Sequence, residues 1–275
     1  MNAVLLFARQ ELLLAIRSRW LQMFAVVFAA LALLVSGAGY VLSGGYGLQD
    51  FGRTAASLVQ LVLLIVPLTA LSFGAMAMTT DRGAAEVVFA QPVARVQVLG
   101  GRYLGLFVAL AAAQALGFGL AGIVLHNQAG PDGMSAFLVV VAMSLGITAV
   151  FLSLATMLAQ GQIGRRARVL ARALILWFVA VLLYDVAVLG VASLLRSGTA
   201  SRMLIIAALA NPVDAMRTLA LIAIEGSSAF GAASLALWRF TGGPIPAILL
   251  ASASLVVWAV APLLIAARRL ARVDI

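Results

Sequence analysis

Long stretches without charged side chains constrain the fold of this 275-residue chain more than any other feature. Residues 20–49, 54–80, 103–125, 133–164 and 240–267 contain no Arg, Asp, Glu or Lys, and residues 173–195 contain only Asp185. As a helix, each stretch is long enough to cross a hydrocarbon layer of ~30 Å at ~1.5 Å per residue. The pattern predicts an all-α membrane protein with six spans near 20–43, 54–79, 103–126, 134–160, 172–195 and 244–267.

The composition excludes a soluble enzyme and a soluble binding module. Hydrophobic residues make up 64% of the chain and charged residues 10%, whereas soluble domains have about 25% charged residues. We therefore expect a single transmembrane domain over residues 1–275. The chain contains no Cys, which removes disulfides, thiolate metal ligands and Cys nucleophiles from consideration.

All 18 basic residues are arginines, and the nine acidic residues leave a net charge of +9. In a soluble protein this excess would suggest nucleic acid, but here the arginines cluster at the ends of apolar runs. They are better explained as topology signals and lipid-headgroup anchors, so we expect membrane lipid and no nucleic acid as a partner. Without Lys the chain has no standard P-loop, so ATP and Mg²⁺ should bind a partner chain and no cofactor should bind this one.

The distribution of the arginines predicts the orientation of the chain. One set of loops carries Arg9, Arg17, Arg19, Arg82, Arg95, Arg102, Arg165, Arg166, Arg168, Arg172, Arg268, Arg269 and Arg272. The other set carries only Arg53, Arg196, Arg202, Arg217 and Arg239. The positive-inside rule then places both termini in the cytoplasm. The first apolar run is too long for the apolar core of a signal peptide.

Two segments on the predicted cytoplasmic side are informative. Residues 1–19 are expected to form an interfacial amphipathic helix, although a solvated lead-in is the alternative. Its apolar positions are Leu5, Leu12 and Ile16, and its polar positions are Arg9, Glu11 and Arg17. Residues 80–99 are expected to form a short helix between two spans, suited to docking a cytoplasmic partner, although an ordinary charged hairpin loop is the alternative. In this segment Gly83 permits a turn, Glu86 begins the helix, Pro92 ends it, and Arg95 and Arg102 flank the next run.

Residues 197–243, on the opposite side, are too apolar for a free loop and too few for a second domain. Asn211 is a suitable N-cap, Pro212 suits the first helical position, and Asp214 follows three residues after the cap. These signals predict a short helix from about 212 to 224 that forms an outer rim.

Asp185 is the one acidic residue well inside a predicted span. It follows Arg172 by thirteen residues, about 20 Å along a helix, so it should lie in the outer half of the membrane. Such a carboxylate is costly in lipid and needs a role. It could pair with Arg196 or Arg217, accept hydrogen bonds across a dimer, or face a polar cavity, so it either holds helix geometry or contacts substrate.

Metal and catalytic sites are not indicated. The single His126 lacks the Asp and Ser neighbours of a catalytic triad, and Met76 and Met78 point in nearly opposite directions on a helix. No series of soft ligands marks a copper path. The spacings Gly101-x-x-x-Gly105 and Gly119-x-x-Gly122 indicate close helix packing, either within the chain or at a dimer seam.

The order of elements and the segment DRGAAEVVFAQPVAR resemble the permease subunits of ABC-2 type transporters. Gly83, Glu86, Pro92, Arg95 and Arg102 match the family's cytoplasmic motif, whereas Ala84 and Ala85 replace its Thr and Leu. The resemblance implies a non-catalytic membrane subunit in which this segment couples to two cytoplasmic ATPase subunits. The implied coupling residues are Asp81, Arg82, Gly83, Glu86, Pro92, Arg95 and Arg102.

Residues 7–20, 184–189 and 209–217 are similar to the Nos-type permeases, a branch that serves copper-site maturation in nitrous oxide reductase. That resemblance implies a homodimer in the bacterial inner membrane and a periplasmic copper-binding partner on the outer rim. The implied rim residues are Asn211, Pro212, Asp214, Arg217 and Glu225. The permease would rearrange this partner or move a small species rather than conduct copper; the alternative is a generic exporter of lipid, drug or polysaccharide.

Overall fold

The computed structural model describes residues 2–42, 51–81, 83, 92–129, 132–225, 237 and 239–272, and every regular element bounded within these ranges is a helix. The first half contains α1 (Ala3–Ile16), α2 (Arg19–Leu42), α3 (Phe51–Met78), α5 (Arg95–Ala129) and α6 (Asp132–Ala159). The second half contains α7 (Arg166–Trp177), the π-helical segment η1 (Phe178–Leu183), α8 (Tyr184–Ser193), α9 (Ser197–Ala210), α10 (Pro212–Glu225) and α12 (Pro244–Ala271). The all-α prediction is confirmed.

The six predicted spans are also confirmed. Within the described residues, six helices are long and apolar enough to cross a membrane: Arg19–Ala38, Thr54–Met78, Arg95–His126, Phe137–Ala159, Arg166–Ser193 and Pro244–Ala271. The outer segment differs from the prediction by containing α9 as well as the expected helix α10. These two helices meet at a bend of 103°, so the pair is either a broken span or a re-entrant hairpin.

The third span begins earlier than the sequence predicts. Helix α5 starts at Arg95 rather than near residue 103, so Arg102 lies within the helix instead of flanking it. The helix can extend through this charge because the guanidinium pairs with Glu11. An ion pair between neighbouring helices lowers the cost of a charge at the membrane boundary.

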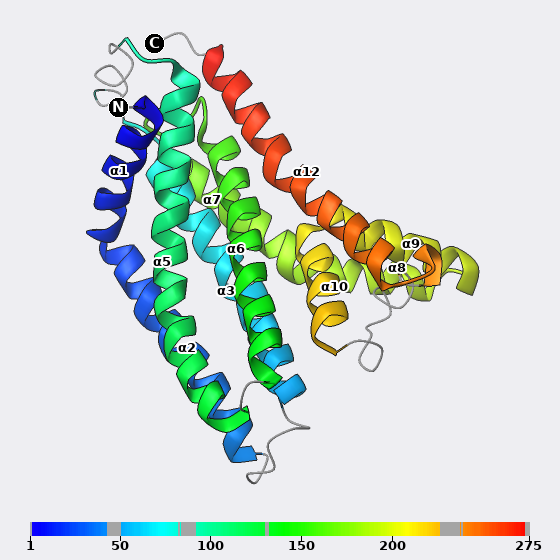
Figure 1. Cartoon of the computed structure of the whole chain (residues 1–275). Coiled ribbons are helices and arrows are strands. Elements are labelled where there is room, and N and C mark those ends of the chain that lie inside the picture. The colour runs from blue at the N-terminus through cyan, green and yellow to red at the C-terminus, as the bar shows by residue number, and fades with distance from the viewer. Residues whose placement is uncertain are drawn as a thin grey trace.

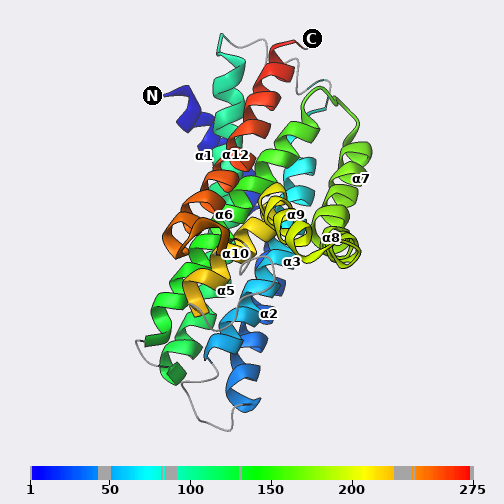
Figure 2. The same cartoon turned by 90° about the vertical axis from the view of Figure 1, so that its right-hand side faces the viewer.

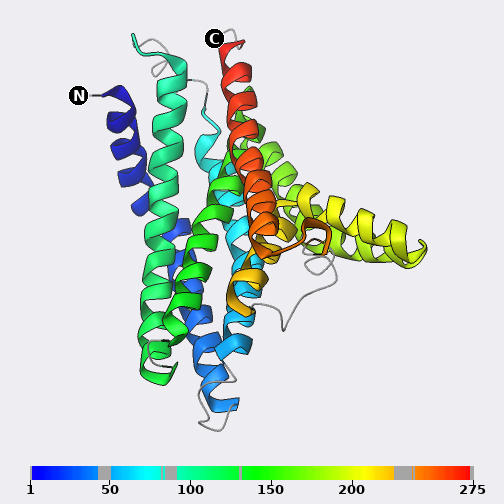
Figure 3. The same ribbon diagram turned by 45° about the vertical axis from the view of Figure 1, so that its right-hand side comes forward.

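The helices form an elongated bundle in which α2, α3, α5 and α6 run side by side, with α7 and α12 against them (Figure 1). The start of α1 and the end of α12 lie at the same end of the bundle. Helices α8 and α9 project sideways from it (Figure 3), and Figure 2 shows them nearly end-on. The buried centre is apolar and includes Phe28, Leu71, Leu110 and Phe151.

Helix α1 packs along the first turns of α5, and two glycines make this contact possible (Figure 1). A Cβ at Gly101 would lie 2.6 Å from the Phe7 Cβ, and one at Gly105 would lie 2.8 Å from the Glu11 Cβ and collide with the Ala8 carbonyl oxygen. This pair of glycines therefore serves packing within the chain. In the second pair, Gly122 packs against the Phe137 ring, whereas Gly119 has open space around it.

A buried polar cluster joins α5 to α6 deep in the apolar core. The Gln114 Nε2 donates to the Thr148 Oγ1 over 2.8 Å, and the Ser144 Oγ donates to the Gln114 Oε1. All three side chains are fully buried. Because each finds a partner inside the protein, the cluster fixes the register of two spans, as interhelical hydrogen bonds do in lipid.

Candidate functional site

Arg102 joins three elements at the end of the bundle that carries both termini. Its Nε lies 3.0 Å from the Glu11 Oε2 on α1, its Nη1 donates to the Thr80 Oγ1 over 3.1 Å, and its Nη2 donates to the Ala77 carbonyl at the end of α3. We call Arg102, Glu11, Thr80 and Ala77 the Arg102 clamp. A planar guanidinium with five N–H donors can hold several partners at once, which an ammonium does less well.

Glu11 is the residue of this clamp that the sequence did not single out. It was named only as a polar position of the first helix, whereas its side chain is 12% exposed and pairs with Arg102. Leu5 and Ile16, expected on a shared apolar face with Leu12, are exposed, and Leu12 packs against the core. A Cβ at Gly105 would lie 2.8 Å from the Glu11 Cβ, so glycine at this position allows Glu11 to pack against α5. The Gly101–Gly105 spacing was the available signal, because it indicated a tightly packed neighbour.

The residues after the end of α3 contact a second part of the chain. The Gly164 N–H donates to the Thr80 carbonyl over 3.1 Å, and Asp81 lies 2.9 Å from Arg166 at the start of α7. Both side chains of this ion pair are more than half exposed, so the pair stabilises the fold little. The packing of α3 against α7 places these two segments side by side, and the ion pair lies at the end of that contact.

Arginines at the same end also cap the carboxyl ends of helices. The Arg95 Nη1 donates to the Leu270 carbonyl near the end of α12, and the Arg269 Nη1 donates to the Met157 carbonyl near the end of α6, each over 3.1 Å. The last four carbonyls of a helix lack intrahelical partners and carry the negative end of its dipole. These arginines therefore stabilise the fold in addition to any part in orientation.

The predicted coupling residues are placed as follows. Asp81, Arg95 and Arg102 lie at this one end of the bundle, where each contacts a different helix. Gly83 is exposed, and Pro92 lies in a bend just before α5. Arg82 and Glu86 lie outside the described residues. The assignment of these residues to coupling therefore remains a prediction.

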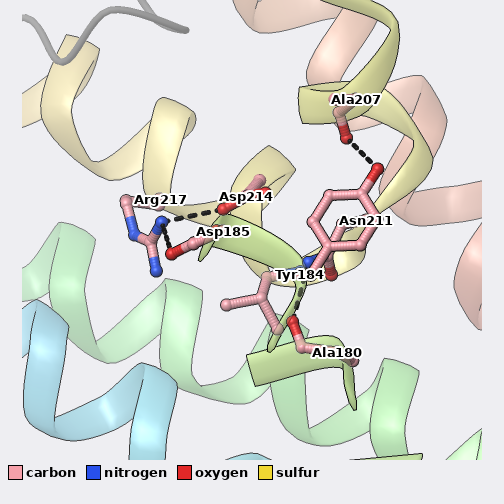
Figure 4. A network of polar contacts seen from close by, with 8 residues as sticks. Ala180, Tyr184, Asp185, Ala207, Asn211, Asp214 and Arg217 are labelled. Carbon is pink, nitrogen blue, oxygen red and sulfur yellow. Dashed lines mark hydrogen bonds and ion pairs between the residues drawn. The ribbon is translucent and has the colours of Figure 1, made fainter. Parts of the chain in front are cut away.

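A second polar site lies where α8 meets α10 (Figure 4). The Arg217 Nη1 is 2.6 Å from the Asp185 Oδ2 and 2.8 Å from the Asp214 Oδ1. Of the partners considered for Asp185, the structure selects Arg217; Arg196 instead precedes the first turn of α9. One guanidinium thus holds two carboxylates, and the side chains of all three are between 13% and 32% exposed. We call Asp185, Asp214 and Arg217 the rim triad.

Hydrogen bonds beside the rim triad hold the bend between α9 and α10 (Figure 4). The Asn211 Oδ1 accepts from the Val213 N–H over 3.0 Å, as expected of an N-cap, and its Nδ2 donates to the Ala180 carbonyl in η1 over 2.7 Å. The Tyr184 hydroxyl donates to the Ala207 carbonyl near the end of α9 over 2.9 Å. The buried position of Asn211 favours a role in fixing the bend over direct contact with a partner.

The remaining rim residues and the candidate metal ligands form no further polar site within the described residues. Pro212 opens α10 and Glu225 is its last residue. Within the described residues, no group of three or more His, Cys, Asp and Glu side chains could hold a metal ion. Met78 is buried in the core, whereas Met76 lines an apolar groove of about 460 Å³ between α2, α3 and α7.

These features describe a multi-pass membrane subunit: an apolar bundle with one polar junction at the end that carries both termini and a second where α8 meets α10. Residues 5–275 match the family described as ABC-2 family transporter protein. The chain belongs to this family and is a permease subunit of an ABC transporter, a class that works with ATPase partner subunits and is generally not itself catalytic.

Two relatives cover most of the chain. One, from Pseudomonas aeruginosa, is named probable ABC transporter permease protein NosY and is 32% identical over 243 residues, which cover 86% of this chain and 88% of the relative. The other, from Stutzerimonas stutzeri, has the same name and is 33% identical over 257 residues, which cover 91% of each chain.

Proposed function

We propose that this chain is the membrane half of an ABC complex that matures the copper sites of nitrous oxide reductase. Two copies would assemble with two cytoplasmic ATPase subunits in the bacterial inner membrane, with both termini in the cytoplasm. ATP and Mg²⁺ would bind the ATPases only. The chain would rearrange a periplasmic copper-binding partner or export a small species. The names of the two relatives and the arginine distribution support this proposal.

The proposed transmission of ATPase motion to the membrane helices rests on the contacts that flank residues 82–94. Before this segment, Thr80 and Asp81 contact the α6–α7 loop and α7; after it, Arg95 contacts α12 and Arg102 contacts α1. A displacement of the segment by an ATPase would therefore reach four other parts of the bundle. A coupled change needs only that these contacts differ between two states.

The alternative is a generic ABC-2 exporter of lipid, drug or polysaccharide. The apolar groove between α2, α3 and α7 is the observation that favours it, because an acyl chain or drug would find an apolar surface there. Loss of nitrous oxide reductase copper on deletion of the gene, with normal envelope lipids and polysaccharides, supports the copper-site proposal. The reverse pattern supports the exporter.

Charge reversal in the coupling segment tests the proposed partner. We expect Glu86→Arg, alone and with Arg95→Glu, to reduce co-purification of the ATPase from native membranes and to abolish its coupled activity, because the docking charges would repel. Thermal unfolding of the purified chain is the control, since Arg95 also caps α12. Intact assembly and coupled ATPase activity in both variants would show that the segment is not the docking site.

Arg102→Gln tests transmission separately from docking. We expect the ATPase to remain bound but the stimulation of its activity by the permease to fall at least several-fold, because Arg102 links α5 to α1 and α3. Arg202→Gln is the matched control, since Arg202 is an exposed arginine on α9 outside both polar sites. Equal stimulation in the two variants would remove the Arg102 clamp from the mechanism.

A further inference from the structure

The last turns of α12 carry a cluster of arginines that neither the Arg102 clamp nor the rim triad uses. Arg268, Arg269 and Arg272, together with Ile265, line a groove of about 310 Å³. Their spacings of three and four residues place them on one face of the helix. All four side chains are exposed.

Within the described part of the chain, none of the three arginines of this cluster forms an ion pair with a carboxylate. The described ion pairs join Glu11 to Arg102, Asp81 to Arg166, and both carboxylates of the rim triad to Arg217. Like charges three and four residues apart on a helix repel one another. An anion in the groove would remove this repulsion, so the charge pattern favours a negatively charged ligand.

The cluster is held on a fixed part of the fold. On the opposite face of α12, Ala266 and Leu270 are buried against Leu99 of α5. The Arg95 side chain caps the Leu270 carbonyl, and the Arg269 side chain reaches the Met157 carbonyl. Because the helix is held on its buried face, the backbone that carries Arg268 and Arg272 is fixed before a ligand binds.

An apolar ridge leads along α12 to the arginines. Val257, Val260 and Leu264 are exposed and follow one another at steps of three and four residues, and Arg268 and Arg272 continue the same line. The surface is thus apolar over the span and strongly positive at its end. An apolar surface followed by a positive one matches a phospholipid, whose acyl chains lie in the hydrocarbon layer and whose phosphate lies at its boundary.

We propose that Ile265, Arg268, Arg269 and Arg272 form a binding site for the headgroup of an anionic phospholipid, with the acyl chains along Val257, Val260 and Leu264. A headgroup with two phosphates, as in diphosphatidylglycerol, suits three guanidiniums better than a single phosphate does. Clusters of basic residues at the boundary end of a transmembrane helix attract anionic headgroups. The site shares no residue with the coupling segment, which contacts α12 through Arg95 and Leu99, and it does not depend on the proposed function.

The test uses the full chain, purified in detergent and titrated with diphosphatidylglycerol or with phosphatidylcholine of the same acyl chains. Native mass spectrometry counts the bound lipids. We expect tight binding of diphosphatidylglycerol and weak binding of phosphatidylcholine. At about 1 kcal/mol for each basic residue near an anionic surface, Arg268→Gln with Arg272→Gln should weaken diphosphatidylglycerol binding roughly 30-fold. Arg269 is left unchanged because it also caps α6.

Arg165→Gln with Arg168→Gln is the matched control. It removes the same charge from exposed arginines that do not line the groove. Binding within about twofold of the unchanged chain supports a localised site; equal weakening in both double variants would show only general attraction and overturn the proposal. Unchanged lipid binding in R268Q/R272Q also overturns it. Lost co-purification of an ATPase with unchanged lipid binding would assign the cluster to a protein partner instead.

Discussion

Arg217→Met will destabilise the protein by about 2 to 4 kcal/mol, because it leaves the carboxylates of Asp185 and Asp214 close together without their shared cation. Removing one partner of a buried ion pair typically costs about 3 to 5 kcal/mol, and the partial exposure of these side chains lowers the expected value. Thermal unfolding of the purified chain in detergent measures the effect. The bend between α9 and α10 should loosen at the same time.

Two companion variants separate the charge effect from a packing effect. Asp185→Asn should cost less than Arg217→Met, since Arg217 keeps Asp214 as a partner. The triple variant D185N/D214N/R217M carries no unpaired charge and should recover most of the lost stability. If the triple variant is as unstable as Arg217→Met alone, the shape of the arginine matters rather than its charge. If Asp185→Asn leaves assembly and transport intact, Asp185 is needed for neither.

Gly105→Ala will displace α1 from α5 and cost about 1 to 3 kcal/mol, the usual range for overpacking. The new Cβ would collide with the Ala8 carbonyl oxygen and lie 2.8 Å from the Glu11 Cβ, and backbone cannot move aside as a side chain can. Because Glu11 would shift, the Arg102–Glu11 pair should break as well. Thermal unfolding and the stimulation of a bound ATPase should therefore both fall.

Gly100→Ala on the same helix provides the control. A Cβ at Gly100 has no neighbour within 4 Å. Alanine inside a helix is favoured over glycine by about 0.5 to 1 kcal/mol, so this variant, with open space for its Cβ, should be neutral or slightly more stable. If Gly105→Ala and Gly100→Ala have the same thermal stability, α1 does not pack closely on α5 at Gly105. The Arg102–Glu11 contact would then need another explanation.

The spans could be predicted from the sequence because the requirements of a membrane-spanning helix are local. Each span must be a long, contiguous, apolar stretch without unpaired charge. The cap at Asn211 was equally local, since an N-cap and a following proline act within one turn. Helix α9 was missed because its signals are weak. It begins after Arg196 without a side-chain cap, and its first residues are small and polar.

The partners of the charged residues could be predicted only in part. Arg217 was one of two candidates for Asp185, because helix spacing limits depth but not the rotation of one helix around another. The pairing of Arg102 with Glu11 spans 91 positions and depends on how α1 lies on α5, which no local pattern encodes. Similarly, the arginines that were expected to anchor lipid headgroups include Arg95 and Arg269, which cap other helices.

The arginines at the end of the bundle that carries both termini have two separate roles, orientation of the chain in the membrane and hydrogen bonding to the ends of helices. The orientation of a membrane chain depends on the sign of the charge, for which lysine would serve as well. Hydrogen bonding to the carbonyls of Ala77, Met157 and Leu270 depends also on the length and planarity of the guanidinium. An all-lysine version of this chain should therefore insert in the correct direction and still fail to close its bundle at that end.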